Sequence, residues 1–336
     1  MKVDAGLGND LSKVPAAIKA LEAAGYDRAS TAEMNHDPFF PLLIAAEHSE
    51  RIELATSIAV GFARSPMILA NIGNDLQAYS KGRLTIGLGS QIQPHIEKRF
   101  SMPWGAPAGK MREMVLSMRA IWDNWYNGTP LQFVGKFYRH TLMTPAFTPK
   151  NNPYGAPKVI LAAVGPHMTE VAGEVADGMI IHPFSTVPFI KNVTLPAIER
   201  GLAKAGKTRA GFELSYSNFV VSGRNEAEFA AAKKAAKERI AFYGSTPAYK
   251  CVLDEIGAGD LQPELNKMSK QGRWQEMGAL ISDAVLNEFA VVGEPKDIVP
   301  QTLARYGAFV DRTSGSFTFV DEDERRKMVE IGRAHV

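Results

Sequence analysis

The sequence has almost no cysteine, since Cys251 is the only one among 336 residues. A lone cysteine cannot close an internal disulfide, and it cannot supply the thiolate cluster of a structural zinc site. The histidines form neither a His-x-His nor a His-Glu-x-x-His pattern, so a metal-hydrolase alternative would have to use His36 and Asp37 as ligands. We therefore predict no metal site.

Long apolar runs and a large charge excess are also lacking. No segment approaches the roughly 18 apolar residues of a membrane span, and the segment that follows Met1 lacks the features of a signal peptide. The 38 basic and 36 acidic residues are spread along the chain and give a net charge of +2. We expect a cytoplasmic protein that binds a small-molecule substrate, with neither nucleic acid nor membrane as a partner.

What the sequence does contain is a regular alternation of short apolar segments and longer amphipathic ones. The apolar segments are expected to be strands at 2–7, 26–31, 51–60, 82–89, 158–164, 178–184, 212–221 and near 307–312. Eight such units without a shift in composition predict an α/β fold, a single (β/α)8 TIM barrel over residues 1–336. Insertions are expected at about 127–157 and 225–288, the second of which contains Tyr243, Tyr249 and Trp274 and is expected to cover the site.

The segment "RLTIGLGSQIQPH", residues 83–95, carries the most conspicuous glycine pattern. A dinucleotide-binding fingerprint would need a third glycine at Ile92 and a helix where Pro94 stands, so that hypothesis fails. In a barrel, the loop after a strand lies on the catalytic face, which here would receive Ser90, Gln91 and His95. Gly87 and Gly89 would let a flat ligand approach the backbone, although tight packing at a strand end is an open alternative.

Polar residues also follow the other predicted strands. They are Glu33, Asn35, His36 and Asp37 after the second strand, Arg64 after the third and His182 after the sixth. Asp37 has the alternative role of capping the helix predicted from Pro38. After the fifth strand, Gly165 and Pro166 begin a helix, whose free N–H groups and positive dipole end favour an anion. An ordinary strand-to-helix turn is the alternative there.

Several segments in this order resemble the bacterial luciferase-like monooxygenase superfamily, and most closely its branch that uses the deazaflavin coenzyme F420. They are "TAEMNHDPF", "ATSIAVGFARSP", "YSKGRLTIGLGSQ", "MREMVLSMRAIW", "GKFY", "AAVGPHMTEVAGEVADG" and "FAVVGEPKDI". The resemblance covers about residues 2–312, and its subfamily consists mostly of uncharacterised oxidoreductases.

The resemblance implies a barrel that holds an isoalloxazine-like ring at its C-terminal face. A non-prolyl cis peptide that backs the ring in this family corresponds to Ser57–Ile58, followed by Ala59. The coenzyme phosphate would lie at Val164, Gly165 and Pro166. The family also implies a homodimer.

Two departures from the family's sugar-phosphate dehydrogenases make sugar phosphate an unexpected substrate. Those enzymes have an acidic residue followed by a histidine after strand two, whereas this chain has Glu33–Met34 and then His36. They also have a glutamate where this chain has Ser90. His36, Gln91 and His95 are the candidate replacements.

The main hypothesis is an F420-dependent oxidoreductase that moves a hydride between the deazaflavin and an organic substrate. His36 or Glu33 would transfer the proton, Gln91 and His95 would orient the substrate, and Arg64 or Arg99 would meet an anionic group. Gly89 and Ser90 would contact the coenzyme, while His182 and Trp274 would contact the substrate. The alternatives are an FMN-dependent monooxygenase with a separate flavin reductase and a non-catalytic flavin-binding protein.

Overall fold

The computed structural model describes residues 1–150, 152–315, 317 and 319–334. Its centre is a closed barrel of eight parallel strands, in which β3 pairs with both β2 and β5 and thereby completes the ring. The barrel strands are β1 (Lys2–Gly6), β2 (Arg28–Thr31), β3 (Glu53–Thr56), β5 (Leu84–Gly89), β8 (Lys158–Ala163), β9 (Gly178–Ile181), β10 (Glu213–Tyr216) and β13 (Arg312–Ser314). The predicted TIM barrel is confirmed.

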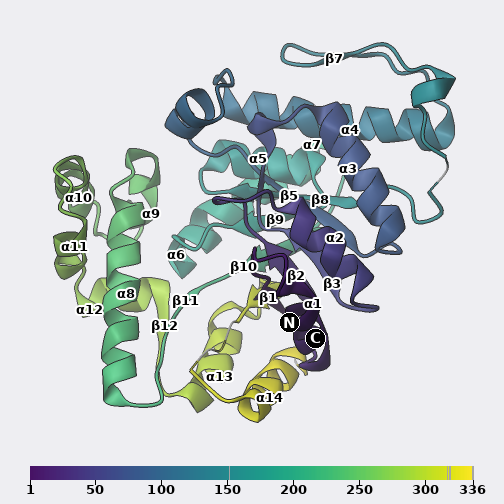
Figure 1. The fold of residues 1–336 in the computed structure, drawn as a ribbon. Helices are drawn as coiled ribbons and strands as arrows, with labels where there is room; N and C mark the ends of the chain where they lie inside the picture. Colours follow the sequence, from purple (N-terminus) through teal and green to yellow (C-terminus); the bar gives the residue numbers. More distant parts are fainter. Residues whose placement is uncertain (151, 316, 318, 335–336) are drawn as a thin grey trace.

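Helices follow most barrel strands and surround the barrel (Figure 1). Those of the barrel layer are α1 (Val14–Ala23), α2 (Phe39–Glu47), α3 (Pro66–Tyr79), α4 (Pro107–Asn127), α5 (Pro166–Val175), α6 (Val187–Phe189), α7 (Leu195–Lys204), α13 (Pro295–Tyr306) and α14 (Glu322–Arg333). Proline occupies an early position of α1, α3, α4, α5 and α13. Its missing N–H costs nothing there, and Pro66, Pro166 and Pro295 marked the starts of α3, α5 and α13 in the sequence.

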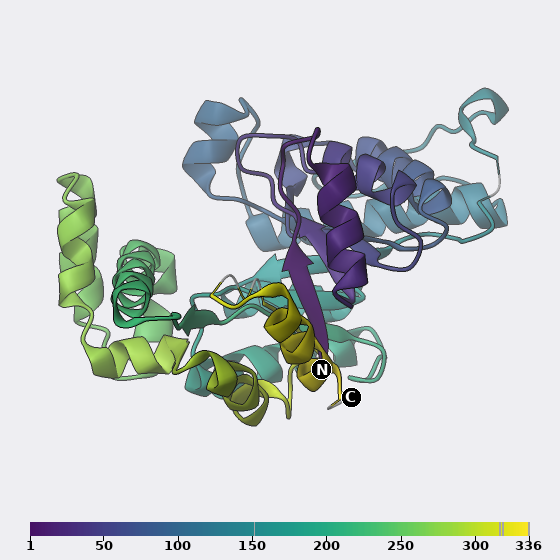
Figure 2. The same cartoon turned by 60° about the horizontal axis from the view of Figure 1, so that its bottom comes forward.

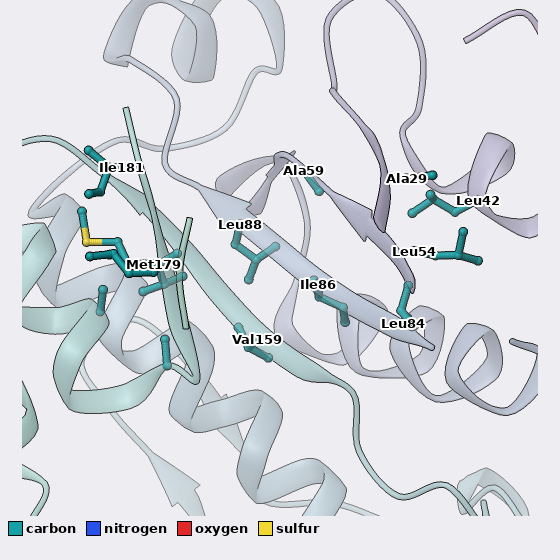
Figure 3. Packing of buried hydrophobic residues seen from close by; sticks show 14 of the residues in the cluster. Ala29, Leu42, Leu54, Ala59, Leu84, Ile86, Leu88, Val159, Met179 and Ile181 are labelled. Atoms are coloured by element: carbon teal, nitrogen blue, oxygen red, sulfur yellow. The ribbon is translucent and has the colours of Figure 1, made fainter. Parts of the chain in front are cut away.

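The barrel strands bury apolar side chains against this helical layer (Figure 3). On β5, Leu84, Ile86 and Leu88 are at most 3% exposed. A Cβ at Gly73 of α3 would lie 2.7 Å from Ile86 Cδ1 and 3.1 Å from Trp122 of α4, so strand and helices meet closely there. The main hydrophobic core is therefore the shell between strands and helices.

Three predicted strands differ from the structure. The segment 51–60 is divided into β3 and β4 (Ala59–Val60). The segment 212–221 is divided, because β10 belongs to the barrel whereas β11 (Phe219–Val221) pairs in parallel with β12 (Ala290–Val292) outside it. Ser217 lies in the chain between β10 and β11, and its hydroxyl accepts a hydrogen bond from that of Ser314 on β13 at 2.6 Å. The last barrel strand begins only at Arg312, because the chain after α13 first turns back through hydrogen bonds to Tyr306.

Two segments lie outside the barrel layer. Residues 128–150 and 152–157 belong to an arm beyond α4 that includes the antiparallel pair β6 (Phe133–Val134) and β7 (Arg139–His140). The second segment contains α8 (Glu226–Gly244), α9 (Lys250–Asp254), α10 (Leu261–Lys270), α11 (Trp274–Met277) and α12 (Asp283–Phe289). These helices stand beside the barrel (Figures 1 and 2) and form a second hydrophobic cluster together with residues such as Phe184 after β9 and Phe219 of β11.

Among the described residues, no helix combines the length and the apolar character that crossing a lipid bilayer requires. The same residues contain no group of three or more histidine, cysteine, aspartate or glutamate side chains placed to hold a metal ion.

Candidate active site

The mouth of the barrel is built around a bulge after β3. The short strand β4 (Ala59–Val60) continues along β5, and the Ser57–Ile58 peptide bond between β3 and β4 is cis. Ser57 N–H donates to Thr31 O at 2.6 Å, and Glu33 N–H donates to Ile58 O at 3.1 Å. The exit of β2 therefore holds the bulge on both sides, at the bond that the family resemblance singled out.

The glycines of β5 face this bulge. A Cβ at Gly87 would stand 2.0 Å from Thr56 O, and one at Gly89 would stand 2.8 Å from Ile58 Cδ1. The space beside both glycines is filled by the chain itself, so the interpretation that they leave room for a flat ligand is wrong. The alternative of tight packing at a strand end accounts for both positions.

Glu33 and Arg64 form a buried ion pair behind the bulge. Arg64 Nη1 donates to Glu33 Oε2 at 2.6 Å, and the N–H of Val60 donates to the same oxygen at 2.7 Å. Arg64 Nη2 donates to Asp37 Oδ2 at 2.7 Å. Burial lowers the pKa of Arg64, but the two carboxylates outweigh it and the pKa is raised. Both charges are thus satisfied within the chain, which argues against Glu33 as a proton donor and Arg64 as an anion contact.

Asp37 also takes its predicted capping role. The N–H of Phe39, the first residue of α2, donates to Asp37 Oδ1 at 2.9 Å. Asn35, the remaining polar residue of this loop, is exposed.

The loop after β5 uses most of its polar atoms locally. Ser90 Oγ donates to Gln91 O at 3.0 Å, and the side-chain oxygen of Gln91 accepts from Ile92 N–H at 3.0 Å. Gln91 has a positive φ of 59°. Arg99, at the end of a short π-helical turn (His95–Arg99), donates to Met34 O and so ties this loop to the β2 exit. The amide of Gln91 is therefore turned toward its own backbone.

His36 and His95 are the two histidines of these tied loops. Both are exposed, and neither imidazole has a hydrogen-bond partner in the part of the chain that the structure describes. Because they are exposed and unpaired there, these rings are free to contact a substrate, as a proton carrier must.

The predicted anion site lies at the amino end of α5. Gly165 is the N-cap residue, no side chain caps the helix, and the space around a Cβ at Gly165 is open. Pro166 has no N–H, and Thr169 N–H is bonded to Gly165 O at 3.1 Å. Val164 packs against the second hydrophobic cluster. The exposed backbone donors and the helix dipole suit a phosphate.

His182 stands where the β9 exit meets the helical insertion. Its ring centroid lies 4.7 Å from that of Tyr243 on α8 and 5.1 Å from that of Tyr249. Burial lowers the pKa of His182 to about 4. Trp274 does not join this group: its side chain is 47% exposed and its ring contact is with Phe242.

A buried ionic network inside the barrel was not predicted. Arg312 is fully buried and contacts Asp4 at 2.6 Å, Glu53 at 3.0 Å and Glu213 at 3.3 Å. Arg28 contacts the same three carboxylates. A signal existed, since each of these charges lies within a segment of apolar residues predicted to be a strand.

One cavity reaches a predicted contact, and a larger one lies away from all of them. A cavity of about 120 Å³ inside the barrel extends from this ionic network up to Ser57. A larger one of about 670 Å³ lies at the opposite, N-terminal face and is lined by Lys158, Arg209 and Asp311 among others. In TIM barrels the active site lies at the C-terminal face and the N-terminal face contributes to stability, so this larger cavity is not the candidate active site.

Comparisons with known proteins identify relatives over nearly the whole chain. A family model described as luciferase-like monooxygenase matches residues 2–312. The uncharacterized protein Rv1360 of Mycobacterium tuberculosis is 53% identical over 323 residues, covering 96% of this chain and 95% of its own. The 5,10-methylenetetrahydromethanopterin reductase of Archaeoglobus fulgidus is 26% identical over 289 residues, covering 84% and 82%.

A solved structure has the same fold. It is the coenzyme F420 dependent tetrahydromethanopterin reductase from Methanopyrus kandleri, which superposes with a TM-score of 0.76 at 20% identity and covers 98% of this chain and 96% of its own.

Proposed function

Because the chain belongs to the luciferase-like monooxygenase family, as the match over residues 2–312 shows, we propose that it is a coenzyme F420-dependent oxidoreductase. It would transfer a hydride between the deazaflavin and an organic substrate. The choice of deazaflavin is supported by the 26% identical reductase relative and by the F420-dependent reductase of the same fold. Bound deazaflavin supplies the hydride chemistry, while the protein positions the reactants and handles the proton.

The observation that carries the proposal is the uncapped amino end of α5 beside the barrel mouth. The N–H groups of His167 and Met168 have no capping side chain to satisfy them, and Gly165 leaves the approach open. A coenzyme phosphate fits this donor set. Ser57, Ile58 and Ala59 would then support the ring, with Gly89 contributing through the packing of Ile58.

For the proton we propose His36, with His95 as the residue that orients the substrate. Glu33 is committed to Arg64 and Val60, whereas both imidazoles are exposed and unpaired among the described residues. Replacing His36 by Asn should lower the turnover number without weakening coenzyme binding, because the residue acts on the substrate. His48, which caps the end of α2, provides the control position.

Binding titrations test the coenzyme. The purified protein is titrated with F420 and, separately, with FMN while the coenzyme fluorescence is followed. We expect binding of F420 with little binding of FMN. Tight FMN binding without F420 binding would instead support the luciferase-like monooxygenase alternative, which needs a flavin reductase. Binding with no turnover on any substrate would favour the non-catalytic flavin-binding protein.

A homodimer is part of the same proposal. Phe40 and Leu43 lie one turn apart on α2 and are 60% and 43% exposed, and Ile68 on α3 is 51% exposed. Exposed apolar side chains on neighbouring helices favour contact with a second copy. Sedimentation velocity of the wild-type protein and of a Phe40→Glu variant tests this: the variant should shift toward the monomer.

A further inference from the structure

We propose that His182, Tyr243 and Tyr249 form a subsite that binds the neutral oxygen, carbonyl or hydroxyl, of the substrate. This inference rests on the proposed function, because it assigns a substrate class to the same site. We call these three residues the aromatic donor cluster.

The cluster joins two parts of the molecule. His182 directly follows β9, on the barrel face that also carries the Ser57–Ile58 bulge and the amino end of α5. Tyr243 lies near the end of α8 and Tyr249 lies six residues later. Phe184 supports the cluster by packing: it is fully buried, and its ring lies 6.0 Å from that of Tyr249 and 4.6 Å from that of Phe289.

The polar tips of the cluster are free. In the described part of the chain, His182 Nε2 and the hydroxyls of Tyr243 and Tyr249 have no hydrogen-bond partner in the protein. None of them is among the buried polar atoms that lack a partner, so all three retain access to the solvent. Accessible, unsatisfied donors on neighbouring aromatic rings can bind a small polar group, because each ring combines an apolar body with a polar tip.

The state of His182 is fixed by its other nitrogen. Phe184 N–H donates to His182 Nδ1 at 3.1 Å, so in the neutral ring the proton is on Nε2. Burial lowers the pKa of this imidazole to about 4 and raises the pKa of Tyr249. At neutral pH both groups are therefore uncharged and can donate.

These properties select the ligand. The neighbouring rings of Phe184 and Phe219 are apolar, and no ion pair involves a member of the cluster among the described residues. A carboxylate or phosphate would have to lose water beside rings that are uncharged at neutral pH, which is costly. A neutral carbonyl or hydroxyl oxygen accepts from such donors without that cost.

Ligand binding to the F420-saturated protein tests the inference. Acetophenone is the probe, and α-methylstyrene, which replaces the carbonyl oxygen by a CH₂ group, is the matched compound without an acceptor. Both are titrated by ligand-observed NMR. The variants Tyr243→Phe and Tyr249→Phe remove one hydroxyl each and keep the ring, and Tyr79→Phe on α3 is the control, since Tyr79 is exposed and lies outside the cluster.

We expect each cluster variant to weaken acetophenone binding by roughly two- to tenfold, as the loss of one neutral hydrogen bond does. Tyr79→Phe should leave it unchanged, and α-methylstyrene should bind the wild type and the cluster variants alike. F420 affinity, measured by fluorescence on the same samples, should be the same throughout. If the fluorescence titration shows that the protein binds no F420, the proposed function is contradicted. A loss of acetophenone binding in the two hydroxyl variants would then still support the subsite.

Two results would overturn the inference. One is acetophenone binding that is absent in the wild type or unaffected in both cluster variants. The other is a loss of F420 affinity in these variants with acetophenone binding intact, which would assign the cluster to the coenzyme.

Discussion

At the scale of single residues, the polar side chains around the barrel mouth differ in whether their partners lie within the chain. Glu33 and Arg64 satisfy one another, and Arg64 also binds Asp37. His36 and His95 are exposed and have no such partner among the described residues. The first pair belongs to the framework of the site, and the two histidines are the ones available to a ligand.

Replacing Arg64 by Met should lower the free energy of unfolding by about 3 kcal/mol, because it leaves Glu33 buried without its counter-charge. The change is measured by urea denaturation. Arg224→Met is the matched control, since Arg224 forms an exposed pair with Glu228 at 2.6 Å and its side chain is 66% exposed. The control should cost at most about 0.5 kcal/mol. Equal losses in the two variants would contradict the assignment of Arg64 to the framework.

His182 should make the stability depend on pH in a defined window. Its pKa is about 4 in the folded protein and about 6.5 in the unfolded chain, so between these values the unfolded state binds more protons. The free energy of unfolding should fall by up to roughly 3 kcal/mol as the pH drops from 6.5 to 4.

In His182→Phe this slope should be shallower. Burial alone would raise the pKa of Glu53, but Arg312, Lys2 and Arg28 outweigh it and lower the pKa to about 2. Glu53 therefore affects stability only at lower pH, and it does so equally in the wild type and the variant. Identical slopes above pH 4.5 would refute the prediction.

At the scale of elements, β5 packs closely against the bulge beside it, with Gly87 against backbone and Gly89 against the Ile58 side chain. Gly8→Ala should leave stability unchanged because nothing lies near that Cβ, and Gly89→Ala should cost about 1 kcal/mol because the Ile58 side chain can shift. Gly87→Ala should cost about 3 kcal/mol or more, since its Cβ would overlap the Thr56 carbonyl. Thermal unfolding of the three variants gives the order, and an unaffected Gly87→Ala would contradict the packing.

The elements that could be predicted are those with local signals. Pro295 marks the start of α13, and β5 ends at Gly89 within the predicted range. The division of 212–221 into β10 and β11 could not be predicted, because it depends on β12, far away in the sequence. Helix α14 packs buried residues against β1, but its sequence is so strongly charged that this packing could not be predicted.

The site shows the same limit. Residue types and their positions after strands were enough to place His36, His95, Gly165 and His182 at the mouth of the barrel. The partners of Glu33, Arg64 and Gln91 are set by tertiary contacts, which no local pattern encodes. The sequence therefore indicated the location of the site better than the role of each residue in it.

At the scale of the whole molecule, the buried apolar side chains of the described residues form two hydrophobic clusters. Leu265→Ala on α10 should speed amide hydrogen exchange in α8 and α10 and leave the barrel strands protected, because Leu265 is fully buried in the second cluster. Leu54→Ala in β3 should have the opposite pattern. Exchange measured by mass spectrometry tests both. Equal acceleration everywhere in either variant would mean that the chain opens as one unit.

The pairing of β1 with β13 has a consequence for synthesis on the ribosome. Asp4 and Arg312 meet inside the barrel although 308 positions separate them. Translation at about 5–20 residues per second places about 15–60 s between the appearance of the two side chains. During that time the outer edge of β1 has no strand to pair with and the Asp4 carboxylate lacks its strongest partner. The nascent chain must therefore keep its first strand from pairing elsewhere until nearly the last part of the barrel has been made.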